Sequence, residues 1–252
     1  MSGPHDTLRI AAVGDLHARK TSRGAFQSLF TAMTNAADVA LLCGDLTDYG
    51  TPEEAEILAQ EIQSALRIPI LGVLGNHDFE TGQQDEVAKI VTAAGVVVLD
   101  GGTHEIHGVG FAGAKGFVGG FGRRQLGNWG EASIKAIVHE TVEEVLKLEG
   151  ALAKLRTPQK IAIIHYAPIQ ATVEGEPPEI VPFCGSSRLE EPLDRYRVTA
   201  VFHGHAHHGS PEGKTRGNVP VFNVAMPLLK RVFPDRQPFK LLEIPVIVES
   251  AV

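Results

Sequence analysis

The sequence predicts an α/β fold, because short apolar runs and helical stretches alternate along it. Three times in the first 100 residues, an apolar run is followed by a polar turn and then by a helical stretch. Strands and helices that alternate at this spacing are typical of β-α-β units in a parallel or mixed sheet with both faces buried. The chain has 252 residues, of which 43% are hydrophobic and 21% charged, so its composition excludes a disordered or fibrous protein.

The three strand–helix units have distinct boundaries. Apolar runs predict strands over residues 8–13, 39–43 and 69–74, and helical periodicity predicts helices over residues 23–36, 51–66 and 83–94. The second helix has the best-marked start, since Thr51-Pro52-Glu53-Glu54 has the form of a capping box with Pro at the first helical position.

The rest of the chain mixes shorter elements with one long helix. Strands are predicted over residues 96–99, 103–112, 160–164, 198–202, 219–224 and 239–248, and helices over 131–156 and 186–195. The long helix is amphipathic, with an apolar face of Ile134, Val138, Val142, Val145, Leu148, Leu152 and Leu155. Residues 113–130 are rich in Gly and residues 170–182 in Pro and Glu, so both are predicted surface loops. No composition break or long linker divides the chain, which predicts a single domain over residues 1–252.

Charge and cysteine usage exclude several classes of protein. Asp and Glu total 30 against 23 Lys and Arg, and the balance of -7 disfavours a nucleic-acid partner. The start of the chain lacks the regions of a signal peptide, and no apolar run approaches the roughly 18 residues of a membrane span, so we expect no membrane partner. Cys43 and Cys184 give no disulfide framework, which makes a cytoplasmic location the expectation.

Potential metal ligands follow five of the predicted strands. They are Asp15 and His17, Asp45, Asn76, His165, and His205 with His207. In open α/β sheets the functional crevice lies outside the carboxyl ends of the strands, so we expect these side chains to converge. Oxygen and imidazole ligands suit Mn, Fe, Zn or related divalent ions. Glycines beside the ligands, at Gly14, Gly44, Gly75 and Gly204, fit the same picture, since close approach of the backbone to a ligand favours Gly.

Each of these motifs also has an ordinary explanation. Asp-x-His is common by chance, Gly-Asn-His-Asp is compatible with a plain turn, and the histidines of residues 203–208 are compatible with a solvated loop. What indicates a metal centre is their conjunction, with every motif at a strand end in a repeating α/β frame.

Taken in order, the motifs match a known family. The series Asp15-x-His17, Gly44-Asp45-x-x-Asp48, Gly75-Asn76-His77-Asp78, His165 and Gly204-His205-x-His207 resembles the calcineurin-like metallophosphoesterase superfamily, in particular its compact bacterial phosphodiesterases and phosphatases. The motifs span residues 14–207, and no ligand of the family pattern is missing. The resemblance implies a four-layer α/β/β/α sandwich with mixed sheets and a metal centre at the strand ends.

The resemblance also implies two divalent metal ions as cofactors. Asp45 would bridge them, one ion would also take Asp15, His17 and His207, and the other would take Asn76, His165 and His205. Ions roughly 3.5–4 Å apart clamp a phosphoryl group and generate hydroxide near neutral pH. Mn, Fe and Zn are the expected ions, with Ni and Co as alternatives.

The mechanism implied by the resemblance is in-line attack on phosphorus by a metal-bridging hydroxide. His77 would protonate the leaving group or stabilise charge near it, and Asp78 would orient His77. Arg123 and Arg124 are candidate substrate residues that would bind a second phosphate, the alternative being two solvated arginines in a mobile loop.

Residues near the motifs have less specific expectations. Asp48 belongs to the family pattern without being a ligand, and we interpret it as a hydrogen-bonding support for its loop. His203 is either a neighbour of the ligands or a packed histidine, and His208 is expected at the surface beside the site. Cys43 ends an apolar strand and is interpreted as a small buried hydrophobe.

The sequence therefore predicts a metal-dependent hydrolase of small phosphate esters or nucleotides. Phosphodiesters are slightly favoured, because compact bacterial members with this complete motif set resemble cyclic-nucleotide phosphodiesterases. A phosphomonoesterase or nucleotide pyrophosphatase is the alternative. A non-catalytic binding module on the same fold is disfavoured, since His77 and all seven ligands are present, and a DNA nuclease is disfavoured by the charge of -7. No heptad pattern or apolar stripe in the sequence indicates an oligomeric state.

Overall fold

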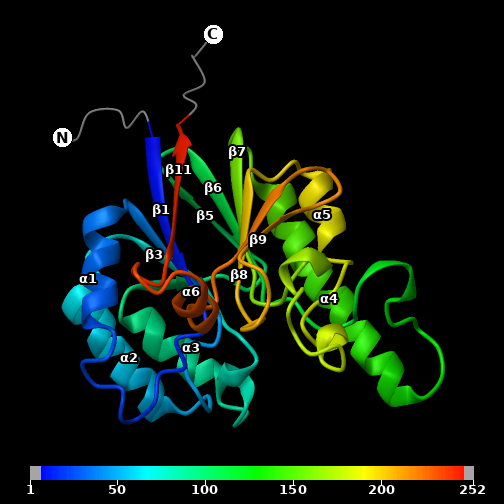
Figure 1. Cartoon of the computed structure of the whole chain (residues 1–252), viewed down its shortest axis with the longest axis horizontal. Coiled ribbons are helices and arrows are strands. Elements are labelled where there is room, and N and C mark those ends of the chain that lie inside the picture. Colours follow the sequence, from blue (N-terminus) through cyan, green and yellow to red (C-terminus); the bar gives the residue numbers. More distant parts are fainter. Residues whose placement is uncertain (1–6, 247–252) are drawn as a thin grey trace.

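Two mixed sheets form the centre of the molecule in the computed structural model, which describes residues 7–246 (Figure 1). The first sheet has the strand order β11-β1-β2-β3-β4. Its strands are β1 (Thr7–Val13), β2 (Val39–Cys43), β3 (Ile70–Val73), β4 (Val96–Val98) and β11 (Lys240–Pro245). β1 to β4 are parallel and β11 is antiparallel to β1, so the sheet is mixed.

The second sheet has the order β5-β6-β7-β8-β10-β9. Its strands are β5 (Gly102–Ile106), β6 (Val109–Gly113), β7 (Gln159–Ile163), β8 (Ala200–His203), β9 (Glu212–Lys214) and β10 (Pro220–Asn223). Both edge strands, β5 and β9, are antiparallel to their neighbours, whereas the central strands are parallel.

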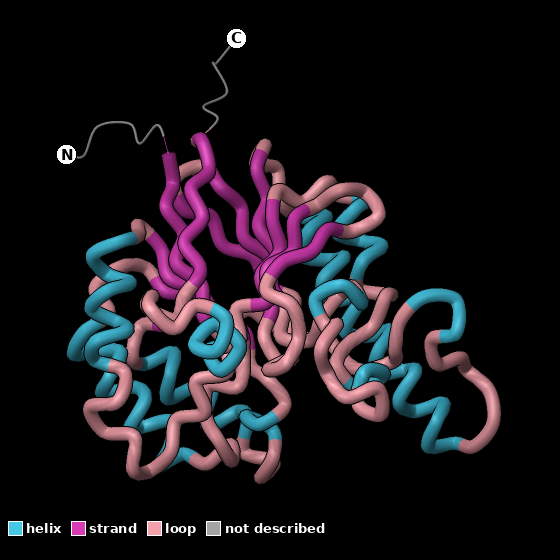
Figure 2. Tube along the Cα trace, viewed as in Figure 1, coloured by secondary structure: helices cyan, strands magenta, loops and turns pink. Residues whose placement is uncertain are grey.

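Helices cover the outer face of each sheet, which gives the expected four-layer α/β/β/α sandwich (Figure 2). On the first sheet lie α1 (Gln27–Ala36), α2 (Pro52–Ala65) and α3 (Gln84–Ala93). On the second lie α4 (Ala132–Lys154) and α5 (Glu190–Arg195), and α6 (Met226–Val232) follows β10. Short 3-10 turns, η1 (His77–Phe79), η2 (Gly122–Arg124), η3 (Gln170–Thr172) and η4 (Val181–Phe183), interrupt the loops.

Alternation of side chains along the strands explains the layers, because successive residues of a strand point to opposite faces. In β2, Leu41 belongs to the core between the sheets, whereas Ala40 and Leu42 belong to the core under α1–α3. In β7, Ile161 and Ile163 enter the core between the sheets, and Ala162 packs in the core under α4 and α5. Both faces of each sheet are therefore buried, as near-continuous apolar runs predict.

The capping box is confirmed, and the neighbouring helix starts later than expected. The backbone N–H of Glu54 donates to Thr51 Oγ1, and Glu54 Oε2 accepts from the N–H of Thr51, so α2 begins at Pro52 as predicted. α1 begins at Gln27 rather than at residue 23. The buried Glu61 carboxylate of α2 accepts from the backbone N–H groups of Gly24 and Phe26, which holds this segment outside the helix.

The apolar face predicted for α4 is only partly correct. Val138, Leu148 and Leu152 are buried as expected, but Val142 is 38% exposed. Glu144 is buried instead, because its carboxylate accepts from the backbone N–H of Gly116 and pairs with Lys147 at 2.8 Å. Here a specific polar contact to the loop after β6 sets the orientation of the helix.

Three further segments differ from expectation. β9 and α6 are short elements with no clear periodicity, and the sequence predicted neither. Residues 170–182 are only partly a surface loop, since Thr172 and Glu176 are buried; Thr172 contacts His203 at the end of β8, and Glu176 accepts from the backbone N–H of His208.

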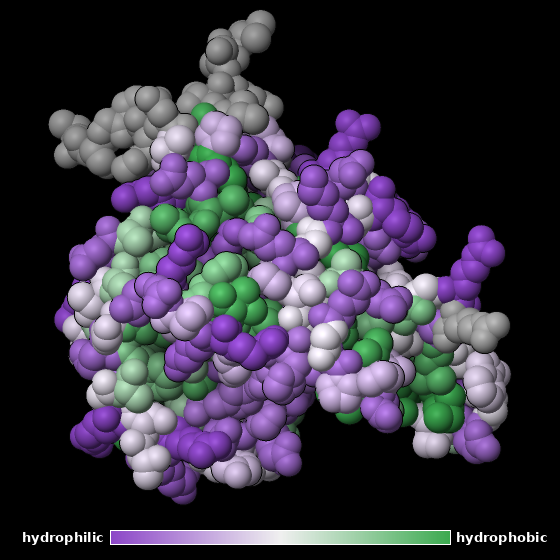
Figure 3. Space-filling model, viewed as in Figure 1, coloured by the Kyte–Doolittle hydropathy of each residue, from purple (hydrophilic) through white to green (hydrophobic). Residues whose placement is uncertain are grey.

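Polar residues cover most of the face in Figure 3, and hydrophobic residues are visible along β1 and β11, over α6 and near the start of α4. Within residues 7–246, the helices are too short or too polar for a membrane span.

Candidate metal centre

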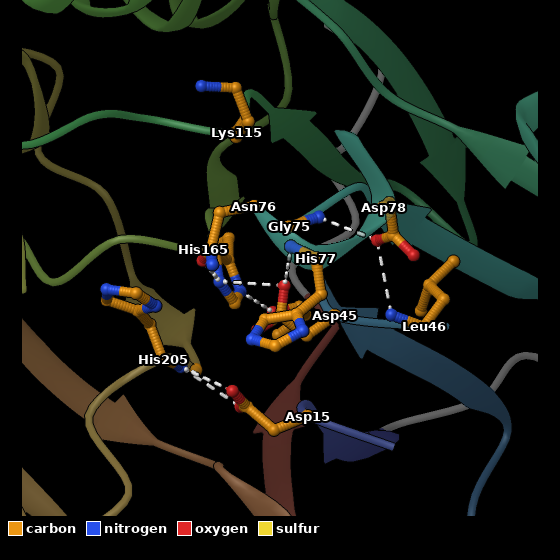
Figure 4. A network of polar contacts seen from close by, with 12 residues as sticks. Asp15, Asp45, Leu46, Gly75, Asn76, His77, Asp78, Lys115, His165 and His205 are labelled. Atoms are coloured by element: carbon orange, nitrogen blue, oxygen red, sulfur yellow. Dashed lines mark hydrogen bonds and ion pairs between the residues drawn. The ribbon is translucent and has the colours of Figure 1, made fainter. Parts of the chain in front are cut away.

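The predicted ligands converge at the carboxyl ends of five strands, where the two sheets meet. One group consists of Asp15, His17 and His207, and a second consists of Asp45, His165 and His205; a third, His17, Asp45 and His77, overlaps both. In each group the potential ligand atoms lie within 4.8 Å of one another. Asn76 joins the second group, since its Oδ1 lies 2.9 Å from Nε2 of His165. The structure thus brings all seven candidates together, and Figure 4 shows most of them around Asp45.

The backbone bends sharply at four of these residues. Asp15, His17, Asp45 and His205 have φ values of 57°, 47°, 47° and 68°, in the left-handed region that non-glycine residues rarely occupy. Strain of this kind collects at functional sites, where the surrounding structure holds it in place. It turns each side chain off the end of its strand and toward the gap between the sheets.

Glycines are required here by close packing, as the sequence predicted. A Cβ at Gly75 would lie 2.2 Å from Oδ1 of Asp45, and one at Gly204 would lie 2.3 Å from Oδ2 of Asp15. A Cβ at Gly44 would lie 2.4 Å from Nδ1 of His165. Each glycine therefore makes room for a candidate ligand.

One ring nitrogen of two histidines is held by a backbone carbonyl. Nδ1 of His165 lies 2.9 Å from the carbonyl oxygen of Cys43, and Nε2 of His205 lies 3.2 Å from that of Phe183. Since carbonyl oxygens only accept, these nitrogens carry the proton, and the other ring nitrogen of each histidine is the one that could bind a metal ion. Nδ1 of His17 lies 3.4 Å from Oδ1 of Asp48 without a hydrogen bond to it.

Two buried carboxylates dominate the electrostatics of the site. Asp15 is 0% and Asp45 1% exposed, and charges buried this deeply are costly unless a cation compensates them. Burial alone would raise the pKa of Asp45, but His165 outweighs burial and holds that pKa well below its usual range. Burial lowers the pKa of His205 to about 4, so this imidazole is neutral, as a metal ligand must be. Oxygen and nitrogen donors in this arrangement fit divalent transition metals.

His77 is held at the edge of the ligand cluster without belonging to the predicted ligand set. Its backbone N–H donates to Oδ1 of Asp45 at 2.8 Å, and its ring meets that of His17 edge-on with centroids 4.6 Å apart. Nδ1 of His77 lies 2.6 Å from the backbone carbonyl oxygen of Asp48 and donates to it. Nε2 is therefore the ring nitrogen that this contact leaves available.

Asp78 does not orient His77, contrary to the expectation from the sequence. Its fully buried carboxylate accepts from the backbone N–H groups of Leu46 at 3.1 Å and Gly75 at 2.8 Å (Figure 4). It also accepts from the backbone N–H of Thr47 at 2.8 Å and from the hydroxyl of Thr47 at 2.6 Å. Burial raises the pKa of Asp78 to about 6. Asp78 therefore ties the loop after β2 to the loop after β3, and so positions Asp45 relative to Asn76.

Asp48 has a larger part than the loop support that the sequence assigned to it. Its backbone carbonyl holds His77, and its carboxylate lies beside His17 and pairs with Arg19 at 2.8 Å. The fixed spacing of Gly44-Asp45-x-x-Asp48 was the available signal, but a backbone carbonyl leaves no trace in residue identity.

His203, His208 and Arg123 belong to none of the groups that could hold a metal ion. His203 is fully buried, with Nε2 2.8 Å from the hydroxyl of Thr172, so it is a packed histidine. His208 is exposed, as expected. Arg123 is exposed in η2 and lines a hollow that none of the seven candidate ligands lines. The side chain of Arg124 lies outside the described part of the structure.

The fold agrees with that of several solved structures. Phosphopantetheinyl hydrolase from Mycobacterium tuberculosis is similar with a TM-score of 0.66 and 15% identity, over 92% of this chain and 95% of that one. The protein TT1561 of Thermus thermophilus is similar with a TM-score of 0.55 and 15% identity, over 96% and 100%. A putative 5'-nucleotidase from Staphylococcus aureus, solved with alpha-ketoglutarate, gives a TM-score of 0.51 and 14% identity, over 97% of this chain and 55% of that one.

Among curated proteins, no sequence matches this chain. The family model for the calcineurin-like phosphoesterases matches residues 8–209, which include every candidate ligand and His77. The chain therefore belongs to the calcineurin-like phosphoesterase family and is a metal-dependent phosphoester hydrolase.

Proposed function

We propose that this chain holds two divalent metal ions and hydrolyses small phosphodiesters by in-line displacement. The observation that carries the proposal is the position of Asp45 between the two ligand groups. Its Oδ1 lies 3.3 Å from Nε2 of His165, and its Oδ2 lies 3.8 Å from Nε2 of His17. The two oxygens of one carboxylate therefore face different groups, as a bridging ligand requires.

The residues divide into two metal sites that share Asp45. One would consist of Asp15, His17 and His207, and the other of Asn76, His165 and His205. When bound, the ions supply Lewis acidity and lower the pKa of coordinated water. The backbone carbonyls of Cys43 and Phe183 support these sites by fixing the orientation of His165 and His205.

His77 is the proposed proton donor to the leaving group. Its Nδ1–H is committed to the carbonyl of Asp48, so the imidazole cannot rotate away, and Nε2 is presented at the edge of the centre. A protonated Nε2 would transfer its proton to the departing alkoxide oxygen. General acid catalysis of this kind contributes typically about 10²–10⁴-fold to the rate.

The charge of the centre does not separate a phosphodiester from a phosphomonoester. Two divalent ions would offset the buried carboxylates Asp15 and Asp45, so the loaded centre would attract either substrate. The preference for a phosphodiester rests on the resemblance of the complete motif set to compact bacterial phosphodiesterases, and the substrate panel below tests it.

We propose that the reaction takes place in the cytoplasm, because neither cysteine forms a disulfide. Cys43 and Cys184 are both buried free thiols. Burial raises the pKa of Cys184 to about 12, which makes its thiol unreactive. Two unpaired cysteines are typical of a reducing compartment.

The decisive experiment is an assay of bis-p-nitrophenyl phosphate after chelation and after Mn²⁺ has been restored. We expect turnover only with metal, and a loss of at least about a hundredfold in His77→Ala and in Asp45→Asn. The matched controls are His139→Ala and Asp100→Asn, which remove an exposed imidazole of α4 and an exposed carboxylate next to β4. Equal activity in Asp45→Asn and Asp100→Asn would contradict the two-metal proposal.

Substrate preference is read from a panel under the same metal conditions. The panel pairs bis-p-nitrophenyl phosphate with p-nitrophenyl phosphate and adds nucleotides and pantetheinyl phosphoesters, because a phosphopantetheinyl hydrolase and a putative 5'-nucleotidase have this fold. Preference for the monoester by more than about tenfold would assign the chain to the alternative, a phosphomonoesterase.

A further inference from the structure

A basic hollow lies outside the metal centre, between the loop after β6 and the start of α5. It has a volume of about 780 Å³, and none of the candidate metal ligands or His77 lines it. Its wall is built from η2, from residues 169–171, from the segment that leads into α5, and from the end of β9. Figure 1 shows α5 and the orange chain around β9 beside each other at this place.

The charge of the hollow is opposite to that of the whole chain. Four cations line it, namely Arg123, Arg188, Lys214 and Arg216, against the two carboxylates Glu190 and Glu191, which leaves a formal balance of +2. The chain as a whole has a balance of -7. An anion is therefore drawn to this hollow more than to the rest of the surface.

Both carboxylates of the hollow are already engaged. Oε2 of Glu190 lies 3.0 Å from both Nε and Nη2 of Arg216, and Oε1 accepts from the backbone N–H of Arg216 at 2.7 Å. Glu191 pairs with Arg195, which does not line the hollow. These pairs leave the other three cations of the hollow without a carboxylate.

Arg123, Arg188 and Lys214 have no ion-pair partner among residues 7–246. Arg188 donates from Nη2 to the backbone carbonyl of Leu126 at 2.8 Å, but its Nη1 is shielded from water and has no acceptor within the same residues. A guanidinium left partly unsatisfied in this way is costly unless negative charge compensates it. The hydroxyl of Ser187 accepts from the N–H of Gly122 and keeps its own proton to donate.

We propose that this hollow binds a small molecule that carries two or more phosphate groups. Two of the three uncompensated cations are arginines, whose planar forks match phosphate oxygens bidentately. Three cations that come from η2, the α5 approach and β9 offer charge-assisted contacts to more than one phosphate group. The volume lies within the range of small-molecule sites.

The test is a calorimetric titration of the metal-loaded enzyme with pentane-1,5-diphosphonate. Its C–P bonds resist hydrolysis, and its separated phosphonates are weak chelators. We expect a binding event that weakens at least about tenfold in Arg188→Gln and in Lys214→Gln, because each loses a charge-assisted contact. Lys214 makes no side-chain hydrogen bond or ion pair within the described residues, so its replacement leaves the local fold intact.

The matched control is Arg67→Gln at the end of α2, which also removes an arginine that donates to a backbone carbonyl, that of Ser64 at 3.1 Å. It should bind like the wild type. Absence of binding, or equal affinity in both hollow variants and the wild type, would overturn the proposal. Equally tight binding of heptanedioate, the dicarboxylate analogue, would overturn the assignment to phosphates.

The outcome is independent of the proposed activity. Turnover of bis-p-nitrophenyl phosphate is measured on the same samples and should stay within about twofold of wild type in all three variants. Failure of turnover would count against the metal centre, and failure of phosphonate binding would count against the hollow.

Discussion

The backbone carbonyl of Asp48 lies 2.6 Å from Nδ1 of His77, while the carboxylate of the same residue lies 3.4 Å from Nδ1 of His17. One residue therefore contacts both the proposed proton donor and a candidate metal ligand, through different parts of its structure. Substitutions at Asp48 separate the two effects, because a change of side chain leaves the carbonyl in place.

Replacing the Asp48 side chain should weaken metal binding more than it impairs proton donation. In Asp48→Ala, His17 loses the oxygen beside its Nδ1, and supports of this kind are typically worth about 10–100-fold in metal affinity. We expect Asp48→Asn to retain more of that affinity. Titration of the chelated protein with Mn²⁺ measures it, and turnover at saturating Mn²⁺ should approach that of the wild type. A large loss of turnover at saturation would show that His77 is also displaced.

Removing the Asp78 carboxylate should destabilise the fold. Asp78→Ala leaves four buried donors of Leu46, Thr47 and Gly75 without an acceptor, and we expect a loss of about 3 kcal/mol or more in the free energy of unfolding. Urea denaturation measures the change. His77→Ala is the comparison, since it should abolish activity with little change in the urea midpoint. Similar urea midpoints for the two variants would contradict the structural role of Asp78.

Substitution of Gly75 should disrupt the centre, because a Cβ there overlaps both the backbone N and Oδ1 of Asp45 at 2.2 Å. We expect Gly75→Ala to lose metal binding and activity. The matched control is Gly150→Ala in α4, where a Cβ meets nothing within 4 Å. Ala favours a helix over Gly by about 1 kcal/mol, so this variant should unfold at higher temperature and keep full activity. Metal content and thermal melts distinguish the two.

The chelated protein should lose stability as pH rises. Burial lowers the pKa of His165, but the Asp45 carboxylate outweighs burial and raises it to about 9. The ordinary value in an unfolded chain is about 6.5. A folded pKa above the unfolded one stabilises the protein fully below about pH 6.5, and that contribution is lost as pH rises through about 9.

We expect a loss on the order of a few kcal/mol over this range, measured by urea denaturation of the chelated protein. Asp45→Asn should flatten the dependence, since it removes the charge that raises the pKa of His165. The metal-loaded protein should not follow the same curve, because an ion binds the neutral imidazole and excludes the proton. A flat profile for the chelated wild type would contradict this account.

The convergence of the candidate ligands could be predicted because its signal lies in side chains at strand ends. Asp15, Asp45 and Asn76 each follow a clear apolar run, and parallel strands bring their carboxyl ends to one edge. The same apolar runs predict the strands of the first sheet, so one feature of the sequence indicates both the sheet and the position of the site.

Contacts made by the backbone could not be predicted in this way. The oxygens that hold His77, His165 and His205 are carbonyls of Asp48, Cys43 and Phe183, and any residue type provides a carbonyl. Asp78 was assigned to His77 because the two are adjacent in sequence, but the 3-10 turn at η1 directs its carboxylate toward Thr47 instead. The burial of Glu144 likewise depends on a loop 28 residues away.

Each ligand group draws residues from both sheets, and this has a mechanical consequence. His207 and Asp15 lie 192 positions apart in the chain, yet Nε2 of one is 2.9 Å from Oδ1 of the other. An ion bound to both residues would tie the two halves of the sandwich together, because sliding of one sheet over the other would break its coordination. If the proposed metals bind, we expect motion on substrate entry to be limited to the loops around the centre.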